Sequence, residues 1–168
     1  MYKEFMSDSM IFLRKVQIED ATEEYCRWMN DPEINRFMET VYTPHSIGDI
    51  REFIDKVNRD KSQVFFAICT QENRKHVGNI KLGPINWFHR KADISLFIGD
   101  KEHWGKGLGS RAIALVTEFA FNTLGLHKVK AGCFEDNPGS LNAFKKCGFE
   151  VEGVLRSDVY REGKWRNS

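Results

Sequence analysis

The chain has 168 residues, of which 41% are hydrophobic and 29% charged, and its formal net charge is +1. A chain of this length can bury a core, so we expect one domain spanning residues 1–168. The near-neutral charge, with no basic block of five residues, disfavours nucleic acid and anionic membrane surfaces as partners. No run reaches the roughly 20 apolar residues of a membrane span, and the polar N-terminus is unlike a signal peptide. These features indicate a cytoplasmic protein.

The four cysteines are scattered and form no C-x-x-C pair. This distribution favours free thiols in a reducing compartment over a disulfide framework or a zinc site, and we expect no bound metal. A nucleophilic cysteine is possible in principle, but small buried cysteines are the commoner case. The residues are Cys26, Cys69, Cys133 and Cys147.

The first third of the chain predicts one strand and three helices. Their approximate ranges are residues 10–16, 18–29, 32–38 and 47–57. In the strand, Arg14 and Lys15 are expected to face solvent, and Asp20 is expected to cap the first helix. Pro32 suits the first turn of the second helix, where a missing N–H costs nothing.

The rest of the chain alternates between apolar strand patterns and helical spacing. Strands are expected over residues 63–70, 76–82, 92–99, 128–134 and 149–155, and helices over residues 108–123 and from residue 137 onwards. This order predicts an α/β fold, with one mixed β-sheet and helices on both faces.

The segment His103–Ser110 connects an expected strand to an expected helix and contains Gly105, Gly107 and Gly109. Glycines let the backbone approach a ligand closely because no Cβ is in the way. The free N–H groups and positive dipole end of the following helix favour an anion. The segment therefore predicts a phosphate-binding loop.

Three kinds of phosphate loop can be compared with this segment. A P-loop requires a lysine followed by a hydroxyl residue after its last glycine, and this segment lacks that order. A dinucleotide fingerprint requires a third glycine where Ser110 stands, and it normally lies early in the chain. The pyrophosphate loop of acyl-CoA-dependent N-acetyltransferases has the pattern Gln/Arg-x-x-Gly-x-Gly/Ala. Gly107 and Gly109 fit that pattern, whereas Trp104 takes the Gln/Arg position.

A second motif strengthens the third interpretation. Residues 137–149 (NPGSLNAFKKCGF) are similar to the N-x-x-S-x-x-x-Y/F-x-K-x-G-F helix of the GNAT N-acetyltransferase superfamily. The resemblance extends from about residue 11 to residue 165. Tryptophan before G-K-G resembles the branch that includes ribosomal-protein N-terminal and nucleotide-amino-sugar acetyltransferases.

The resemblance implies a fold as well as a reaction. It implies a GNAT-like mixed central β-sheet with helices on both faces, in which two strands splay apart at the acetyl-CoA site. Relatives usually continue beyond a turn such as residues 161–165 into another strand that completes the sheet. We therefore expect either that this chain is truncated or that the edge is filled in another way.

By resemblance, acetyl-CoA is the co-substrate and its pantetheine arm lies between the splayed strands. Backbone groups of Phe97, Ile98 and Gly99 would hold the arm and polarise the acetyl carbonyl, although these residues could equally be a plain buried strand. Asn137 is expected to bond the pantetheine or simply to cap its helix. Lys145 is expected near the 3′-phosphate, with Lys146 beside it as a further candidate. The pyrophosphate would be held by Trp104, Gly105, Lys106, Gly107, Leu108, Gly109 and Ser110; Lys106 is equally well a solvated charge.

The acid and base of the reaction are less clear from the sequence. Many relatives have a tyrosine where this chain has Phe144, so that proton donor is absent. Ser140 matches a serine to which some relatives assign protonation of the departing thiolate, and a structural first-turn serine is the alternative. The base remains open among Asp93, His89, Glu39 and Asp158, and water is a further route for the proton.

The acceptor amine is expected to meet the segment Trp28–Thr40. Within it, Arg36 is a candidate for a phosphate, Trp28 and Phe37 for stacking on a base or sugar, and Glu39 for an ammonium. The competing interpretation is that the apolar residues here only pack two helices together.

Three functions follow from these motifs. The favoured one is acetyl transfer to a nucleotide-linked amino sugar, because the acceptor segment resembles that of such enzymes. The same chemistry on a ribosomal or other protein N-terminus, or on a polyamine, is the first alternative. A non-catalytic CoA-binding sensor is the second. The partner is expected to be a small-molecule or peptide amine, and the protein a monomer or homodimer.

Overall fold

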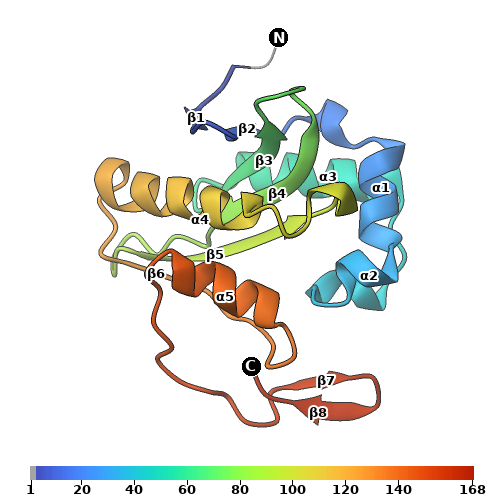
Figure 1. The fold of residues 1–168 in the computed structure, drawn as a ribbon, viewed down its shortest axis with the longest axis vertical. Helices are drawn as coiled ribbons and strands as arrows, with labels where there is room; N and C mark the ends of the chain where they lie inside the picture. The colour runs from blue at the N-terminus through green and yellow to red at the C-terminus, as the bar shows by residue number, and fades with distance from the viewer. Residues whose placement is uncertain (1–2) are drawn as a thin grey trace.

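A computed structural model describes residues 3–168 (Figure 1). Over these residues a six-stranded sheet has the order β1-β2-β3-β4-β5-β6, antiparallel throughout except for the parallel pair β5–β6. The strands are β1 (Met6–Ser7), β2 (Ile11–Lys15), β3 (Val64–Thr70), β4 (His76–Leu82), β5 (Lys91–Ile98) and β6 (Lys128–Lys130). β1 was not anticipated from the sequence; its two residues are too few for a periodic pattern.

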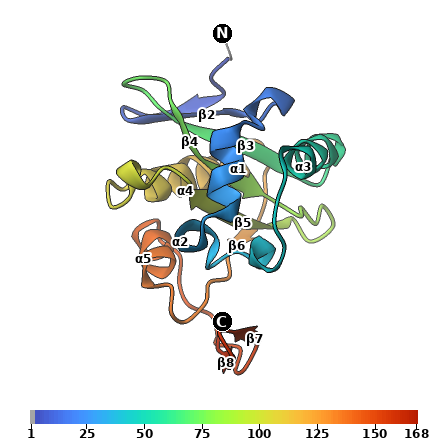
Figure 2. The same cartoon turned by 90° about the vertical axis from the view of Figure 1, so that its right-hand side faces the viewer.

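Helices lie on both faces of this sheet, as predicted (Figure 2). They are α1 (Glu23–Asn30), α2 (Pro32–Asn35), α3 (Ile47–Arg59), α4 (Leu108–Glu118) and α5 (Pro138–Lys146). Short turns complete the set: the 3-10 turns η1 (Ile18–Asp20), η2 (Glu39–Tyr42) and η3 (Lys101–His103), and the π-turn η4 (Phe119–Thr123). None of the described helices has the length and apolar composition needed to span a membrane.

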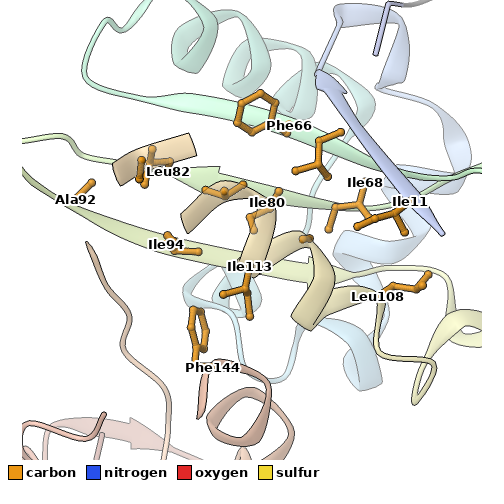
Figure 3. Packing of buried hydrophobic residues seen from close by; sticks show 14 of the residues in the cluster. Ile11, Phe66, Ile68, Ile80, Leu82, Ala92, Ile94, Leu108, Ile113 and Phe144 are labelled. Carbon is orange, nitrogen blue, oxygen red and sulfur yellow. The ribbon is translucent and has the colours of Figure 1, made fainter. Parts of the chain in front are cut away.

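The sheet separates two hydrophobic clusters because successive side chains of a strand point to opposite faces. From β3, Phe66 and Ile68 join the cluster beneath α4, whereas Phe65 and Ala67 join the cluster beneath α1 and α3. Figure 3 shows the first cluster, in which Phe144 of α5 points toward Ile113 of α4. α5 is thereby fixed against the helix that follows the glycine segment.

The N-terminal region corrects two predictions. Arg14 is buried, with 6% of its surface exposed, and does not face solvent. Its guanidinium binds both carboxylate oxygens of Asp20 at 2.7 Å. Asp20 therefore serves as an ion-pair partner at the end of η1, and Thr22 caps α1 by accepting a hydrogen bond from the Tyr25 amide.

The C-terminal region corrects two further predictions. The strand expected over residues 128–134 ends at Lys130, and residues 149–155 form no strand. Val151, Val154 and Leu155 are each more than half exposed. Leu155 exchanges two backbone hydrogen bonds with Ser168, of 2.9 and 3.1 Å, but the segment joins no strand of the described sheet. A separate two-stranded hairpin follows, made of β7 (Val159–Arg161) and β8 (Lys164–Arg166).

The Arg14–Asp20 pair generates a stability prediction. Burial by itself raises the pKa of Asp20, but the Arg14 guanidinium and the Gln17 amide outweigh burial and hold that pKa below its usual range. Asp20→Ala takes the carboxylate away from a buried guanidinium, and we expect a loss of about 3 kcal/mol in the free energy of unfolding at pH 7. Urea denaturation measures this loss.

Asp55→Ala is the matched control, because Asp55 forms an exposed pair with Arg59 and should cost less than about 0.5 kcal/mol. Since the folded-state pKa of Asp20 is depressed, its contribution is present at neutral pH and disappears as the pH falls through that pKa. Wild type and Asp20→Ala should converge in stability in acid. Equal effects of the two substitutions at pH 7 would contradict this account.

Candidate functional site

The site begins where β5 loses one of its neighbours. β5 pairs with β4 from Ile94 to Ile98, but it pairs with β6 only over Lys91–Asp93. Beyond Asp93 none of the described strands lies beside the edge of β5 that faces away from β4. This is the splayed arrangement that the family resemblance implied.

The hydrogen bonds to β4 determine which backbone groups this open edge presents. The Gly83 amide donates to the Asp93 carbonyl, and the Gly99 amide donates to the Val77 carbonyl, each at 2.8 Å. Because bonding directions alternate along a strand, Leu96 and Ile98 direct their N–H and C=O groups to the open edge. Phe97 and Gly99 direct their N–H and C=O groups toward β4. Leu96, rather than these two residues, therefore presents the backbone groups expected to hold the pantetheine arm. The sequence indicated that successive residues of this strand alternate in direction, but it did not indicate which of them direct their backbone groups toward β4.

Trp104 closes over the end of this edge. Its indole Nε1 donates a hydrogen bond to the Ile98 carbonyl at 2.8 Å, and the side chain remains 39% exposed. In this protein the residue at the Gln/Arg position of the loop pattern thus anchors the loop to β5. The Ile98 N–H and both backbone groups of Leu96 remain available to a ligand.

The glycine loop has the backbone that its sequence predicts. Gly105 and Gly107 adopt positive φ angles of 71° and 78°, where a side chain would be strained. Gly107 is the N-cap residue of α4 and supplies no side-chain cap; the Arg111 amide is the first to bond back, to the Gly107 carbonyl at 3.2 Å. Among the described residues, no acceptor meets the amides of residues 105–110. A row of free donors at the start of an 11-residue helix suits a phosphate group.

A hollow of about 520 Å³ adjoins this loop. Gly107 and Ser110 line it together with two basic residues, Arg111 and Lys146, and two acidic ones, Asp8 and Glu118. Arg111 is paired with Asp8 at 2.7 Å. Lys145, the predicted phosphate-binding lysine, is exposed and does not line the hollow. Sequence reasoning did not single out Arg111; its place in the first turn of the helix after the loop was the available signal.

The second motif forms the start of α5. The Asn137 side chain accepts a hydrogen bond from the Ser140 amide at 3.1 Å and so caps the helix, which was one of its two expected roles. Ser140 is partly buried. Phe144 is 6% exposed and packs against Phe149 with ring centroids 5.0 Å apart, so this position is part of the core.

Trp28, at the start of the predicted acceptor segment, packs against the face of β5 that carries the Phe97 side chain. Trp28 is only 6% exposed and packs on Phe97 and His76, with ring centroids 6.3 and 5.4 Å away. A Cβ built on Gly99 would lie 2.1 Å from the Trp28 ring, so the two fit directly against each other. The prediction that Trp28 stacks on the acceptor is therefore wrong, because its ring is part of the core.

Phe37 lies beyond the end of α2, between two guanidinium groups. Arg36 lies 4.6 Å and Arg161 4.9 Å from the centre of its ring. Arg161, in β7, is 7% exposed and bonds Asp136 at 3.0 Å, which ties the C-terminal hairpin to both the acceptor segment and the loop after β6. Sequence reasoning missed Arg161, since only the tertiary fold brings it to Phe37. Among the candidates here, Arg36 and Glu39 are exposed.

Acidic residues outnumber basic ones along this segment. Residues 23–39 contain five carboxylates and two arginines. Lys101 of η3 is held by two of the carboxylates, Asp31 at 2.7 Å and Glu33 at 2.6 Å. Lys75 lies 3.5 Å from a third, Glu24, so lysines of neighbouring elements balance part of the excess and a small net negative charge remains.

The four candidate bases do not converge on one point. Asp93 is paired with Lys130 at 3.0 Å, and Asp158 accepts a hydrogen bond from Ser168. His89 lies in the turn before β5, and Glu39 begins η2.

The cysteines are free. Burial raises the pKa of the Cys69 thiol to about 11 and also raises that of Cys147. Neither thiol has the lowered pKa that nucleophilic cysteines require.

Known proteins resemble this chain in sequence. The family described as "Acetyltransferase (GNAT) domain" matches residues 11–150. An uncharacterized N-acetyltransferase of Bacillus licheniformis is 29% identical over 92% of this chain and 85% of that protein. The spermidine N(1)-acetyltransferase of Escherichia coli (strain K12) is 31% identical over 71% of this chain and 63% of that relative.

The structural comparison agrees with the family match. A crystal structure of Vibrio cholerae spermidine N-acetyltransferase, in complex with CoA and spermine, has a TM-score of 0.85 and 25% identity, covering 95% of this chain and 92% of that one. These relatives do not support the finer branch of ribosomal-protein and nucleotide-amino-sugar enzymes that the motifs suggested. With the family matched over most of its length, the chain belongs to the GNAT acetyltransferases and is an acetyl-CoA-dependent N-acetyltransferase.

Proposed function

We propose that this enzyme transfers the acetyl group of acetyl-CoA to a primary amine of a polyamine of the spermidine class. The observation that carries the proposal is the excess of carboxylates along residues 23–39, which Lys101 and Lys75 balance only in part, on a segment packed against Phe97 of β5. A polyamine is a polycation and is attracted there, whereas a nucleotide-linked sugar carries a diphosphate and is repelled. The spermidine N-acetyltransferases among the relatives support the same substrate class.

In this proposal acetyl-CoA lies along the glycine loop and the open edge of β5. The free amides of residues 105–110 bind the pyrophosphate, and the exposed Lys146 provides a cation in the adjoining hollow, where Arg111 is paired with Asp8. The Leu96 and Ile98 backbone groups hold the pantetheine arm as a missing strand would, and place an N–H beside the acetyl carbonyl. Asn137 caps α5 where that helix meets the arm. Residues 1–168 act as one domain.

The reaction then needs two proton movements. The neutral amine attacks the thioester carbonyl carbon, the C–S bond breaks, and the thiolate leaves. Ser140, in the first turn of α5, donates a proton to that thiolate and recovers one from water, so its hydroxyl is neutral again at the end of the step. The described residues offer no converging base, so water takes the proton of the amine and carries it to solvent.

A nucleotide-linked amino sugar is the second candidate acceptor. Arg36 favours it, because this arginine is exposed beside Phe37 and could meet a phosphate while the ring meets a base. Arg36→Ala separates the two acceptors. It should weaken the binding of a nucleotide sugar and leave that of a polyamine unchanged or slightly improved.

The acceptor class is tested by measuring thiol release from acetyl-CoA with purified protein. We expect turnover with spermidine and spermine, at least about 100-fold faster in kcat/KM than with nucleotide-linked amino sugars, because charge complementarity raises both capture and affinity. Raising the ionic strength should increase the KM for spermidine, since the attraction is screened. The opposite order of substrates would overturn the polyamine assignment and leave the family intact.

The phosphate-binding loop is tested by Gly107→Ala. An alanine at a φ of 78° is strained by about 1–2 kcal/mol, which disturbs the row of amides at the start of α4. We expect calorimetry to show acetyl-CoA affinity reduced about tenfold. Gly163→Ala is the control: its φ is 76° and the space around it is open, but it lies in the turn between β7 and β8. Equal losses of affinity in the two variants would argue against a specific role for the loop.

The proposed proton donor is tested by Ser140→Ala. If Ser140 protonates the thiolate, kcat should fall about 100-fold while the KM for acetyl-CoA changes little. The helix cap is preserved, because Asn137 bonds the backbone amide of residue 140 rather than its side chain. A kcat within twofold of wild type would leave Ser140 a structural residue.

A further inference from the structure

The turn η3 connects the two substrate regions of this enzyme. It directly precedes Trp104 and the glycine loop, and it directly follows the end of β5. Its first residue, Lys101, reaches across to α2, which belongs to the proposed acceptor segment. Its side chain contacts the acceptor segment, and its backbone carbonyl accepts a hydrogen bond from the Trp104 amide.

On the acceptor side, Lys101 holds the beginning of α2. Asp31 is the N-cap residue of α2, and its Oδ1 accepts a hydrogen bond from the Glu33 amide at 2.9 Å. The Lys101 Nζ donates to Asp31 Oδ2 and Glu33 Oε2, so it fixes the cap and the first turn together. Hydrogen bonds to these two carboxylates raise the pKa of Lys101, which keeps it charged.

On the cofactor side, η3 is capped by Asp100. This residue is 7% exposed; its Oδ1 caps the turn at the Glu102 amide, and its Oδ2 lies 2.7 Å from Lys75 Nζ and 3.1 Å from His103 Nδ1. The Trp104 amide bonds back to the Lys101 carbonyl at 3.1 Å. A displacement of Lys101 is therefore transmitted to Trp104, and the reverse also holds.

We propose that Lys101 is a positioning residue that couples acetyl-CoA binding to the ordering of the acceptor segment. When phosphate binds the glycine loop, it immobilises Trp104 and η3, and Lys101 then restrains Asp31 and α2. By thermodynamic reciprocity, an amine that orders α2 strengthens acetyl-CoA binding by the same factor. The inference rests on the proposed function for the placement of acetyl-CoA and of the acceptor.

The size of the coupling follows from the exposure of the groups. Lys101, Asp31 and Glu33 are 40%, 31% and 62% exposed, so solvent screens their attraction. Half-exposed ion pairs of this kind correspond to a change of about two- to fivefold in an equilibrium constant.

The test is hydrogen–deuterium exchange of the full chain with and without saturating acetyl-CoA, and no acceptor is added. In wild type, we expect the amides of residues 31–37 to exchange about threefold more slowly when acetyl-CoA is bound, in keeping with this coupling. In Lys101→Gln, acetyl-CoA should still bind, as calorimetry would show, but the slowing should disappear. Lys101→Arg should restore it.

Lys128→Gln is the matched control. Lys128 also pairs closely with a carboxylate, Glu152 at 2.6 Å, but it lies in β6, and its loss should leave the slowing unchanged. Glu33→Gln breaks one contact from the α2 side with Lys101 in place, and it should reduce the slowing even if Lys101→Gln fails to fold.

Three results would overturn the proposal: no slowing in wild type with acetyl-CoA bound, full slowing in Lys101→Gln or in Glu33→Gln, or loss of acetyl-CoA binding in Lys101→Gln. The last would make Lys101 part of the cofactor site. Because no acceptor is present, these outcomes are independent of whether the acceptor is a polyamine. Failure of wild type to bind acetyl-CoA would instead contradict the proposed site itself.

Discussion

Every part of the site depends on β6 pairing with β5 only along Lys91–Asp93, which leaves β4 as the one strand neighbour of Ile94–Ile98 among the described residues. Where β6 stops pairing, at Asp93 and Lys130, the backbone groups of the partly buried Leu96 and Ile98 are left at an open edge. Buried backbone donors and acceptors are costly unless they are paired. An extended ligand arm that supplies those partners is therefore bound by the same interactions that hold a sheet together.

The other elements are arranged around that edge. Trp104 ties the glycine loop to Ile98, α5 packs on α4 through Phe144, and Trp28 fits against Gly99 on the opposite face of β5. The elements that we propose to bind the phosphate and the amine thus both contact one strand, β5.

The sequence predicted what local chemistry determines and missed what only the tertiary fold determines. The glycine loop, the helix after it and the Asn137 cap follow from residues that are neighbours in the chain, so their patterns were informative. Arg14 was misjudged, and for Trp28 the packing interpretation rather than the acceptor-stacking one holds, because a charged or aromatic side chain gives no sign of which distant group will cover it. The open edge was expected only through family resemblance, and the phase of β5 required the register with β4. Residues 149–155 had the composition of a strand, but a strand also needs a partner.

The most direct test of the central claim is a crystal structure of the protein with acetyl-CoA. The account predicts density for the pyrophosphate on the amides of residues 105–110, and for the pantetheine arm running beside Leu96 and Ile98. An empty glycine loop, or an arm bound away from the open edge of β5, would contradict it.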